Sequence, residues 1–306
     1  MRSRVSLFCD QIIEAGWLLA LIIVPLYFNV YSSRVFEPDK ITILRSIVLI
    51  MALAWLIRTL GEGVRGPRIL TSAPDGADPA QASQGRVSRI VRLPLLLPTL
   101  VLVAAYVIST IFSVTPHISL WGSYQRLQGT FTTFSYIVVF FMILQNLRRP
   151  EQLQRLLYAV VLTSLPISFY GILQHYGLDP LPWGGNVMAR VASNMGNAIF
   201  ISAYLIMVFP LTLACIVNAL NTALEQQARR AKVGFAAFYG ACVLLQMWAW
   251  GALGVGRGLL VSGLLLVALA LAALYLRRPL ARFILLGLLG FVQSLQLVCI
   301  LFSQSR

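Results

Sequence analysis

Long apolar runs recur along almost the whole chain. Each is about twenty residues long, the length that about 30 Å of bilayer hydrocarbon requires of an α-helix. Membrane-spanning β-strands would need only about ten residues of alternating polarity. Hydrophobic residues make up 58% of the 306 residues and charged residues only 11%, which excludes a soluble domain with a wet surface. The sequence therefore predicts an all-α, polytopic integral membrane protein.

Nine of these runs are predicted to cross the membrane. They lie at about Ile12–Tyr31, Ile41–Leu60, Leu93–Phe112, Thr130–Leu147, Leu153–Gln174, Ala198–Val217, Val233–Leu253, Leu259–Leu276 and Phe283–Phe302. Asp10 precedes the first run, Glu14 lies at its beginning, and no small-residue cleavage site follows it. The first run is therefore interpreted as a retained helix and not as a cleaved signal peptide.

Residues 61–92 differ from the rest of the chain. They are rich in Gly, Pro, Ala, Ser, Gln and Arg and contain almost no aliphatic clusters. Such a composition cannot bury enough apolar surface to fold, so a disordered, basic cytoplasmic linker is expected there. The chain is thus predicted to comprise two helices with an outer loop in residues 1–60, this linker, and a seven-helix membrane bundle in residues 93–306.

Basic residues predict the orientation, because Lys and Arg of short loops are retained on the cytoplasmic side. A cytoplasmic N-terminus places seventeen of the 24 Lys and Arg residues inside and seven outside. The net charge of +14 is then mainly a topology signal. No basic stripe is interleaved with stacking aromatic residues, so nucleic acid is excluded as a partner.

The outer basic residues work against this orientation and call for another explanation. They are Arg34, Lys40, Arg45, Arg126, Arg190, Arg257 and Arg306, opposed only by Glu37, Asp39 and Asp179. A guanidinium group is planar, permanently charged and suited to bidentate recognition of phosphate. Arg126, Arg190 and Arg306 are predicted to converge on a lipid diphosphate at the outer headgroup level. Arg34 and Arg257 are interpreted as snorkelling or helix-capping residues.

The stretch from His175 to Leu205 is the part around which the chain is organised. A Gly- and Pro-rich loop there runs into an apolar helix, and Arg190 lies close to the junction. Broken backbone beside a helix start would hold this arginine in a fixed position and present its charged fork to an anion. The sequence therefore predicts that Arg190 is the central residue of the site.

Other motifs carry no chemistry by themselves. The four cysteines, Cys9, Cys215, Cys242 and Cys299, lie at or within predicted helices without short spacing, so buried packing is expected in place of a zinc site or disulfides. GVGRG at Gly254–Gly258 lacks the third glycine and the preceding strand of a dinucleotide-binding loop. We interpret it as a tight outer turn between two helices.

Three segments carry a resemblance to a known family: SVTPHISLWGSYQRLQGTF (Ser113–Phe131), ARVASNMGNAIFISAYLIMVFPL (Ala189–Leu211) and LFSQSR (Leu301–Arg306). They resemble the O-antigen ligase and O-antigen polymerase superfamily of bacterial membrane glycosyltransferases. FEPDK (Phe36–Lys40) is also similar in position, so the resemblance covers essentially the whole chain. It implies two functional pairings, Arg190 with the helix opening Gly196–Asn197, and Arg306 with Ser305.

The resemblance also implies a reaction. Members transfer a glycan from an undecaprenyl-pyrophosphate carrier to a hydroxyl of a glycan, lipid or protein acceptor, in lipopolysaccharide or polysaccharide biosynthesis. The reaction takes place at the outer face of the cytoplasmic (inner) membrane and uses no metal or nucleotide cofactor. Whether this chain would be a ligase or a polymerase stays open.

The family draws its general base from a histidine in a large external loop, which would follow Arg306. His117 and His175 lie at predicted outer positions, but neither matches that histidine, so the catalytic residue is unknown. We therefore expect the chain to be a fragment, the product of a broken gene or one half of a split protein. By itself it should bind the carrier but transfer glycan poorly, since loss of a general base typically costs about 10²- to 10⁴-fold in rate.

Two alternatives remain. Glu37 and Asp39 resemble the metal-binding pair of other, metal-dependent polyprenyl-phosphate-sugar glycosyltransferases, although Pro38 and Lys40 make a helix-start turn the plainer interpretation. A lipid-linked glycan transporter or flippase would require ionisable groups at mid-membrane depth. The predicted helix centres contain only polar residues such as Gln246 and Gln293.

Overall fold

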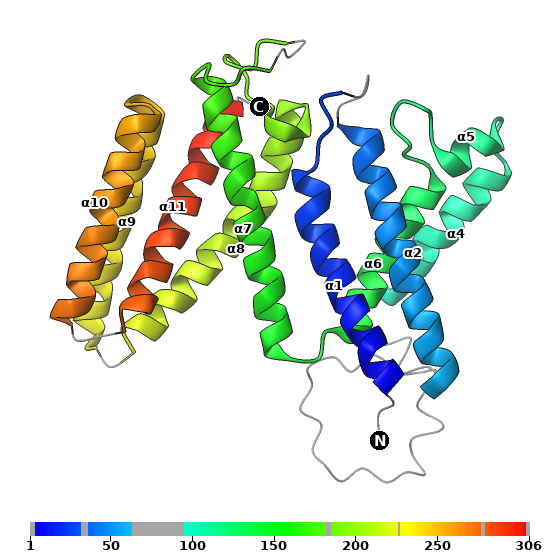
Figure 1. Cartoon of the computed structure of the whole chain (residues 1–306), viewed down its shortest axis with the longest axis horizontal. Helices are drawn as coiled ribbons and strands as arrows, with labels where there is room; N and C mark the ends of the chain where they lie inside the picture. The colour runs from blue at the N-terminus through cyan, green and yellow to red at the C-terminus, as the bar shows by residue number, and fades with distance from the viewer. Residues whose placement is uncertain are drawn as a thin grey trace, which may run out of the picture. The chain divides into compact units, whose positions relative to one another are not determined.

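The computed structural model describes residues 4–31, 36–62, 95–181, 185–225, 227–276 and 279–303 (Figure 1). Within these ranges the chain forms helices joined by turns, and no β-strand occurs there. The chain divides into two compact units, Met1–Leu156 and Leu157–Arg306, and the boundary falls inside one helix. Of the predicted linker, residues 63–92 lie outside the described ranges.

Among its described residues, the first unit contains five helices and the beginning of a sixth. These are α1 (Arg4–Leu26), α2 (Glu37–Glu62), α4 (Leu96–Ile111), α5 (Pro116–Trp121), α6 (Thr130–Asn146) and the first turns of α7 (Pro150–His175). Helix α1 packs along α2, and both contact α6. Their common core is apolar and includes Ile13, Trp17 and Met51, each at most 1% exposed.

The second unit is built around one central helix. Its elements are the rest of α7, the 3₁₀ turn η2 (Ser193–Met195), α8 (Ala198–Ala223), α9 (Arg229–Ala252), α10 (Val255–Tyr275) and α11 (Leu280–Ser303). Helix α11 packs against α8, α9 and α10. In its most apolar 18-residue window, 61% of the residues are buried, more than in any other candidate span among the described residues. Helix α11 therefore carries most of the packing of this unit.

Seven described helices are long and apolar enough to cross a membrane. They are α1, α2 and α7 to α11, whereas α4 and α6 are apolar but only 16 and 17 residues long. The all-helical prediction is thus confirmed for the described residues, and the chain is a multi-pass membrane protein. The count of nine spans, the cytoplasmic N-terminus and the inner membrane as the location stay predictions.

The predicted start of the first helix at Ile12 is wrong. Helix α1 begins at Arg4 and so includes Asp10 and Glu14. Both carboxylates are paired with arginines, since Asp10 lies 2.6 Å from Arg58 and Glu14 lies 2.8 Å from Arg155. Paired charges at a helix end need not lie in water, so α1 can extend beyond the apolar run and include both carboxylates.

The interpretation of GVGRG as a tight turn also needs correction. Only Gly254 has a turn conformation, with φ of 84°, and it precedes α10 as its N-cap residue. Val255 to Gly258 form the first turn of α10 itself. Gly258 fits there because its Cα faces the ring of Trp250, so that a Cβ would lie 2.7 Å from a ring carbon. The glycine therefore allows close packing of α10 on α9.

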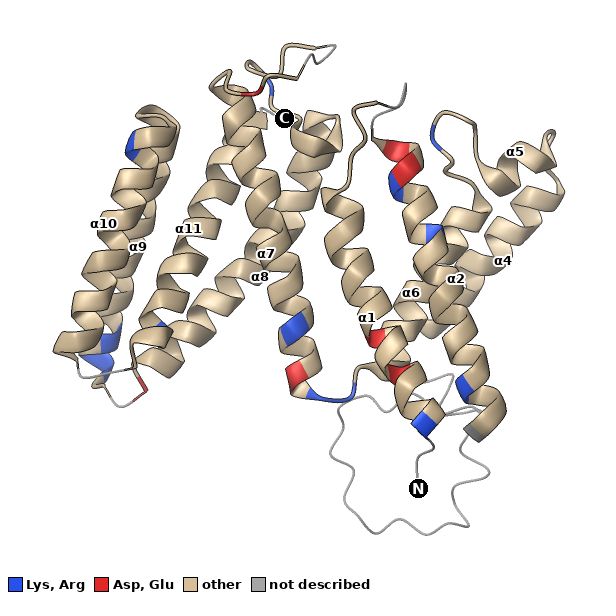
Figure 2. Cartoon of the chain, viewed as in Figure 1, with Lys and Arg blue, Asp and Glu red and all other residues tan. Residues whose placement is uncertain are grey.

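Charged residues gather towards the ends of the helices within each unit, and the helix middles are almost free of them (Figure 2). This segregation agrees with membrane crossing but does not determine which end is cytoplasmic. We expect a cysteine introduced at the exposed Ser123 to react with an impermeant reagent in intact cells, and one introduced at Ser83 to react only after permeabilisation. Ser83 itself lies outside the described ranges.

The native cysteines should give little background in this labelling, because three are buried and Cys242 is half-buried. External labelling at Ser83 together with protection at Ser123 would reverse the predicted orientation.

Candidate functional site

The junction of the second unit that is predicted to face outwards begins where α7 ends at His175. Gly177 turns the chain with φ of 66°, a left-handed conformation that glycine adopts without strain. Asp179 then ties the loop back to α7, because its carboxylate accepts a hydrogen bond of 2.7 Å from the Tyr170 hydroxyl. The backbone N–H of Leu181 also donates to Asp179. Residues 182–184 lie outside the described part of the chain.

Arg190 is exposed and is attached to the end of α11. Its Nε donates a hydrogen bond of 3.3 Å to the backbone oxygen of Ser303, and the next residue, Val191, donates its N–H to the backbone oxygen of Phe302 at 3.2 Å. The two terminal nitrogens of the guanidinium group make no hydrogen bond to any described residue. The arginine is thus held by one nitrogen, and its fork remains available to an anion.

His175 lies at the same junction. Its Nδ1 is 2.8 Å from the backbone oxygen of Met188, and its ring stacks on Phe302 at a centroid distance of 3.6 Å. The neighbouring Tyr176 donates its hydroxyl to the backbone oxygen of Trp250. Burial raises the pKa of Tyr176 above its ordinary value. Phe302 and Ser303 therefore anchor both His175 and Arg190.

Gly196 and Asn197 open helix α8. Gly196 has a left-handed conformation with φ of 73°, and the side chain of Asn197 accepts a hydrogen bond of 2.9 Å from the N–H of Ile199. This is a standard N-cap, which satisfies a backbone donor at the helix start. The two residues therefore shape the loop that follows Arg190. No described contact gives either of them a direct binding role.

Two buried residues of this junction were missed in the sequence. Gln174 accepts a hydrogen bond of 2.7 Å from the N–H of Ser193, and the Ser193 hydroxyl donates to the backbone oxygen of Ile167 at 2.7 Å. Ser193 has a positive φ of 50°, which is uncommon for a residue with a side chain. Sequence periodicity could not identify this pair, because each residue alone is an ordinary polar residue near a helix end.

Helix α7 packs closely against the residues next to the junction at Gly171. A Cβ on Gly171 would lie 2.7 Å from Sγ of Cys299 and 2.9 Å from Cγ1 of Val191. We expect Gly171→Ala to destabilise the protein by about 1–3 kcal/mol, because a well-packed core resists an added methyl group. In contrast, Gly240→Ala in α9 should be neutral or stabilising by up to about 1 kcal/mol, since nothing lies within 4 Å of the added methyl. Equilibrium unfolding in mixed micelles measures both, and equal effects would contradict this account of the packing.

In the first unit, the predicted site residue Arg126 has a partner. It lies 3.7 Å from the carboxylate of Glu37, while its side chain is 66% exposed. Asp39 accepts a hydrogen bond of 3.0 Å from Asn29, and Lys40 donates to the backbone oxygen of Pro25. Glu37 to Lys40 form the first turn of α2, so the interpretation of FEPDK as a helix start is confirmed.

The carboxylates of Glu37 and Asp39 are thus engaged with nitrogen donors of Arg126 and Asn29. Nowhere in the described ranges do three His, Cys, Asp or Glu side chains group in a way that could hold a metal ion.

Arg45 has a structural role that the sequence did not reveal. Its Nη2 donates to the backbone oxygens of Trp121 and Leu127 at 2.8 and 2.7 Å and to the hydroxyl of Thr132 at 2.7 Å. The guanidinium carbon also lies 4.8 Å from the centre of the Phe131 ring. Its Nε also donates to the Thr132 hydroxyl, so Arg45 fixes the loop that carries Arg126 through its Nε and Nη2 nitrogens.

The remaining predicted residues are less informative. Arg257 lies exposed in the first turn of α10, and His117 lies exposed in α5. Arg34, Ser305 and Arg306 fall outside the described residues. Arg126 belongs to the first unit and Arg190 to the second. The convergence of Arg126, Arg190 and Arg306 on one diphosphate stays a prediction.

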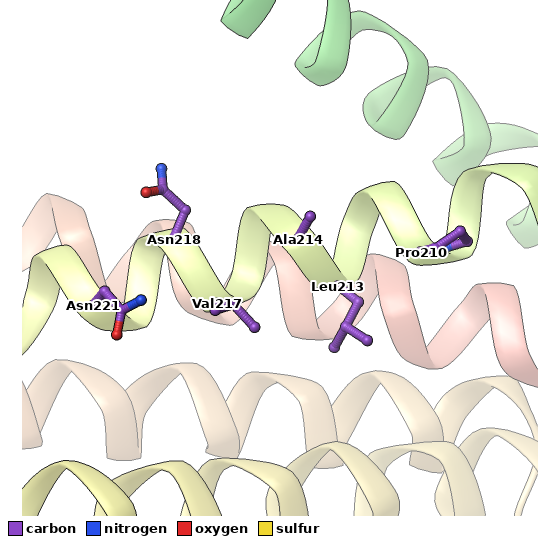
Figure 3. Close-up of a pocket in the computed structure, with 6 residues that line it drawn as sticks. All are labelled: Pro210, Leu213, Ala214, Val217, Asn218 and Asn221. Atoms are coloured by element: carbon purple, nitrogen blue, oxygen red, sulfur yellow. The ribbon is translucent and has the colours of Figure 1, made fainter.

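One groove lies on the surface of α8 in the second unit (Figure 3). Its lining residues are Pro210, Leu213, Ala214, Val217, Asn218 and Asn221. Asn218 is 21 residues along the helix from the N-cap Asn197, a distance of about 30 Å at the α-helical rise. The nearest lining residue of the groove, Pro210, is 13 residues or about 20 Å along the helix from Asn197, so the groove does not adjoin the junction.

The junction around Arg190 has the geometry of an anion site, with an anchored guanidinium group, an exposed fork and a capped helix start beside it. The catalytic residue stays unknown. Neither a protein-family model, nor a curated protein, nor a solved structure matches this chain.

Proposed function

We propose that this protein is a membrane glycosyltransferase of the O-antigen ligase and polymerase type. Its donor is a glycan linked to undecaprenyl pyrophosphate in the cytoplasmic membrane, and its acceptor is a hydroxyl group at the outer face. The proposal is supported by the sequence resemblance and by the position of Arg190. It assigns Arg190 to the pyrophosphate.

The anchoring of Arg190 is the observation that carries this proposal. An arginine that only snorkelled to lipid headgroups would need no attachment to the protein. The Nε of Arg190 instead donates a hydrogen bond to the Ser303 backbone oxygen, and this bond orders the side chain before any ligand binds. An ordered fork loses less conformational entropy when it binds, so both remaining nitrogens can engage phosphate oxygens.

The proposed reaction follows from this placement. A bond forms between the acceptor oxygen and the anomeric carbon, while the bond from that carbon to the pyrophosphate oxygen breaks. The pyrophosphate leaves with the electron pair, and the acceptor proton passes to a base. Because negative charge grows on the leaving group, a preorganised arginine stabilises the transition state more than the ground state.

Binding of the carrier tests the proposal. We expect the purified chain in nanodiscs to bind undecaprenyl diphosphate about tenfold or more tightly than undecaprenyl monophosphate, since one additional charge-assisted hydrogen bond is worth about 1.5–3 kcal/mol. Affinity should not change when EDTA is added. Equal affinity for both lipids would contradict the proposal. Metal-dependent binding that is lost in Glu37→Gln would favour the metal-dependent alternative.

A further inference from the structure

Helices α7 and α11 run in the same direction and face each other with polar or small residues. Ser164 of α7 meets Gln296 of α11, and Gly171, two turns further along, approaches Cys299. Gln296 Nε2 donates to the hydroxyls of Ser164 at 2.7 Å and of Thr212 in α8 at 2.9 Å. This part of the second unit is therefore a polar layer between three helices.

Several buried polar atoms in this layer have no partner among the described residues. They are Oε1 of Gln296, both amide atoms of Gln293 and Oγ of Ser168. The three residues are at most 4% exposed. Gln293 lies one turn before Gln296 and Ser168 one turn after Ser164, so each shares a helix face with a residue of the layer.

The unpartnered hydroxyl of Ser168 is unusual for a serine in a helix. A buried helical serine can donate to the backbone oxygen four residues earlier, and Ser202, Ser262 and Ser294 all do so. Ser168 makes no such bond. Its donor is therefore available to a group on the α11 side of the layer.

Apolar contacts close the layer along α7 and α11. On the side of the junction, Gly171 packs against Cys299 and Val191. On the other side, one turn before Ser164 and Gln293, lie Val161 and Leu289, both at most 1% exposed. The unpartnered atoms are thus buried between apolar contacts at both ends of the layer, where each would cost about 1–3 kcal/mol if it stayed unsatisfied.

We propose that α7, α8 and α11 enclose a hydration site, in which at least one ordered water bridges Ser168, Gln296 and Gln293. Water fits because the free atoms include acceptors, Oε1 of both glutamines, and donors, Gln293 Nε2 and the Ser168 hydroxyl. A metal cation would leave the Gln293 donor unsatisfied. The site is independent of the proposed function.

A double-mutant cycle on the full chain in nanodiscs tests this site. Ser168→Ala and Gln293→Met should each lower Tm, because each removes hydrogen bonds to the water. Each kcal/mol of stability lost in this way corresponds to a decrease in Tm of about 2–4 °C. The double variant should lose less than the sum, because both residues share the water. Ser168→Ala combined with Ser262→Ala is the control and should be additive, since Ser262 bonds to Gln246 and Trp250 in a separate network.

If the layer contains no water, the substitutions should raise Tm and not lower it. If either single substitution raises Tm, the buried groups were unsatisfied and the hydration site does not exist. A rise in Tm with sodium but not with choline, with this effect absent in Gln293→Met, would show that a cation and not water occupies the site. That result would also overturn the proposal.

Radiolytic footprinting of the unsubstituted chain adds a test that requires no variant. Hydroxyl radicals formed from a bound water oxidise the nearest side chains. Cys299 should be oxidised and Cys9 should not, although both are at most 3% exposed. Equal protection of the two cysteines would contradict the proposal.

Discussion

Asp10→Ala should destabilise the first unit by about 3–5 kcal/mol, the usual cost of leaving one partner of a buried ion pair alone. The side chain of Arg58 is only 2% exposed and lies 2.6 Å from Asp10. Its remaining described partner is the side-chain oxygen of Asn146, which is also buried. Asp10 is 25% exposed, so water can enter after the substitution and place the cost at the lower end of this range. Equilibrium unfolding in mixed micelles measures the effect.

Two variants separate this charge effect from simple loss of packing. Asp10→Ala combined with Arg58→Met should recover much of the stability, because no unpaired charge remains. Arg155→Ala breaks the pair with Glu14, but the Arg155 side chain is 57% exposed, so a cost below about 1 kcal/mol is expected. The account of the first unit is wrong if Asp10→Ala costs no more than Arg155→Ala.

Hydrophobicity was sufficient to predict the class of fold. The start of α8 at Ala198 agrees with the sequence prediction, because Gly196 and Asn197 mark it with a turn and a cap. The start of α1 at Arg4 did not follow from the sequence, since the apolar run begins only near Ile12 and the pairing of Asp10 and Glu14 was not visible there. Their partners, Arg58 and Arg155, are 48 and 141 positions away, and no local pattern reveals such pairs.

The candidate site shows the same limit. The position of Arg190 at a loop-to-helix junction was readable from Gly, Pro and Asn around it. Its anchor on Ser303 was not, because that bond joins residues 113 positions apart. Arg45 was noted only as an outer arginine, yet its four hydrogen bonds all go to residues 121–132. Sequence thus predicted which arginines are unusual, and only the packing distinguishes a structural arginine from an available one.

Arg190→Gln should weaken binding of undecaprenyl diphosphate by about 10- to 100-fold, which corresponds to about 1.5–3 kcal/mol for hydrogen bonds to a charged group. Glutamine can replace neither the charge nor the second donor nitrogen of the fork. Arg190→Lys keeps the charge but loses the planar fork, so an intermediate loss is expected. Stability should change little, because Arg190 is exposed and its side chain makes only one described hydrogen bond, to Ser303.

Arg257→Gln is the matched control, since Arg257 is also exposed in the second unit and predicted to face outwards. The decisive measurement is the Kd for undecaprenyl diphosphate in nanodiscs for the unsubstituted chain, Arg190→Gln, Arg190→Lys and Arg257→Gln. The account predicts a large loss for glutamine at position 190, a smaller loss for lysine there, and less than a threefold change for Arg257→Gln, roughly the worth of a rim charge. Unchanged affinity in Arg190→Gln, or equal losses at both arginines, would contradict the assignment of Arg190 to the pyrophosphate.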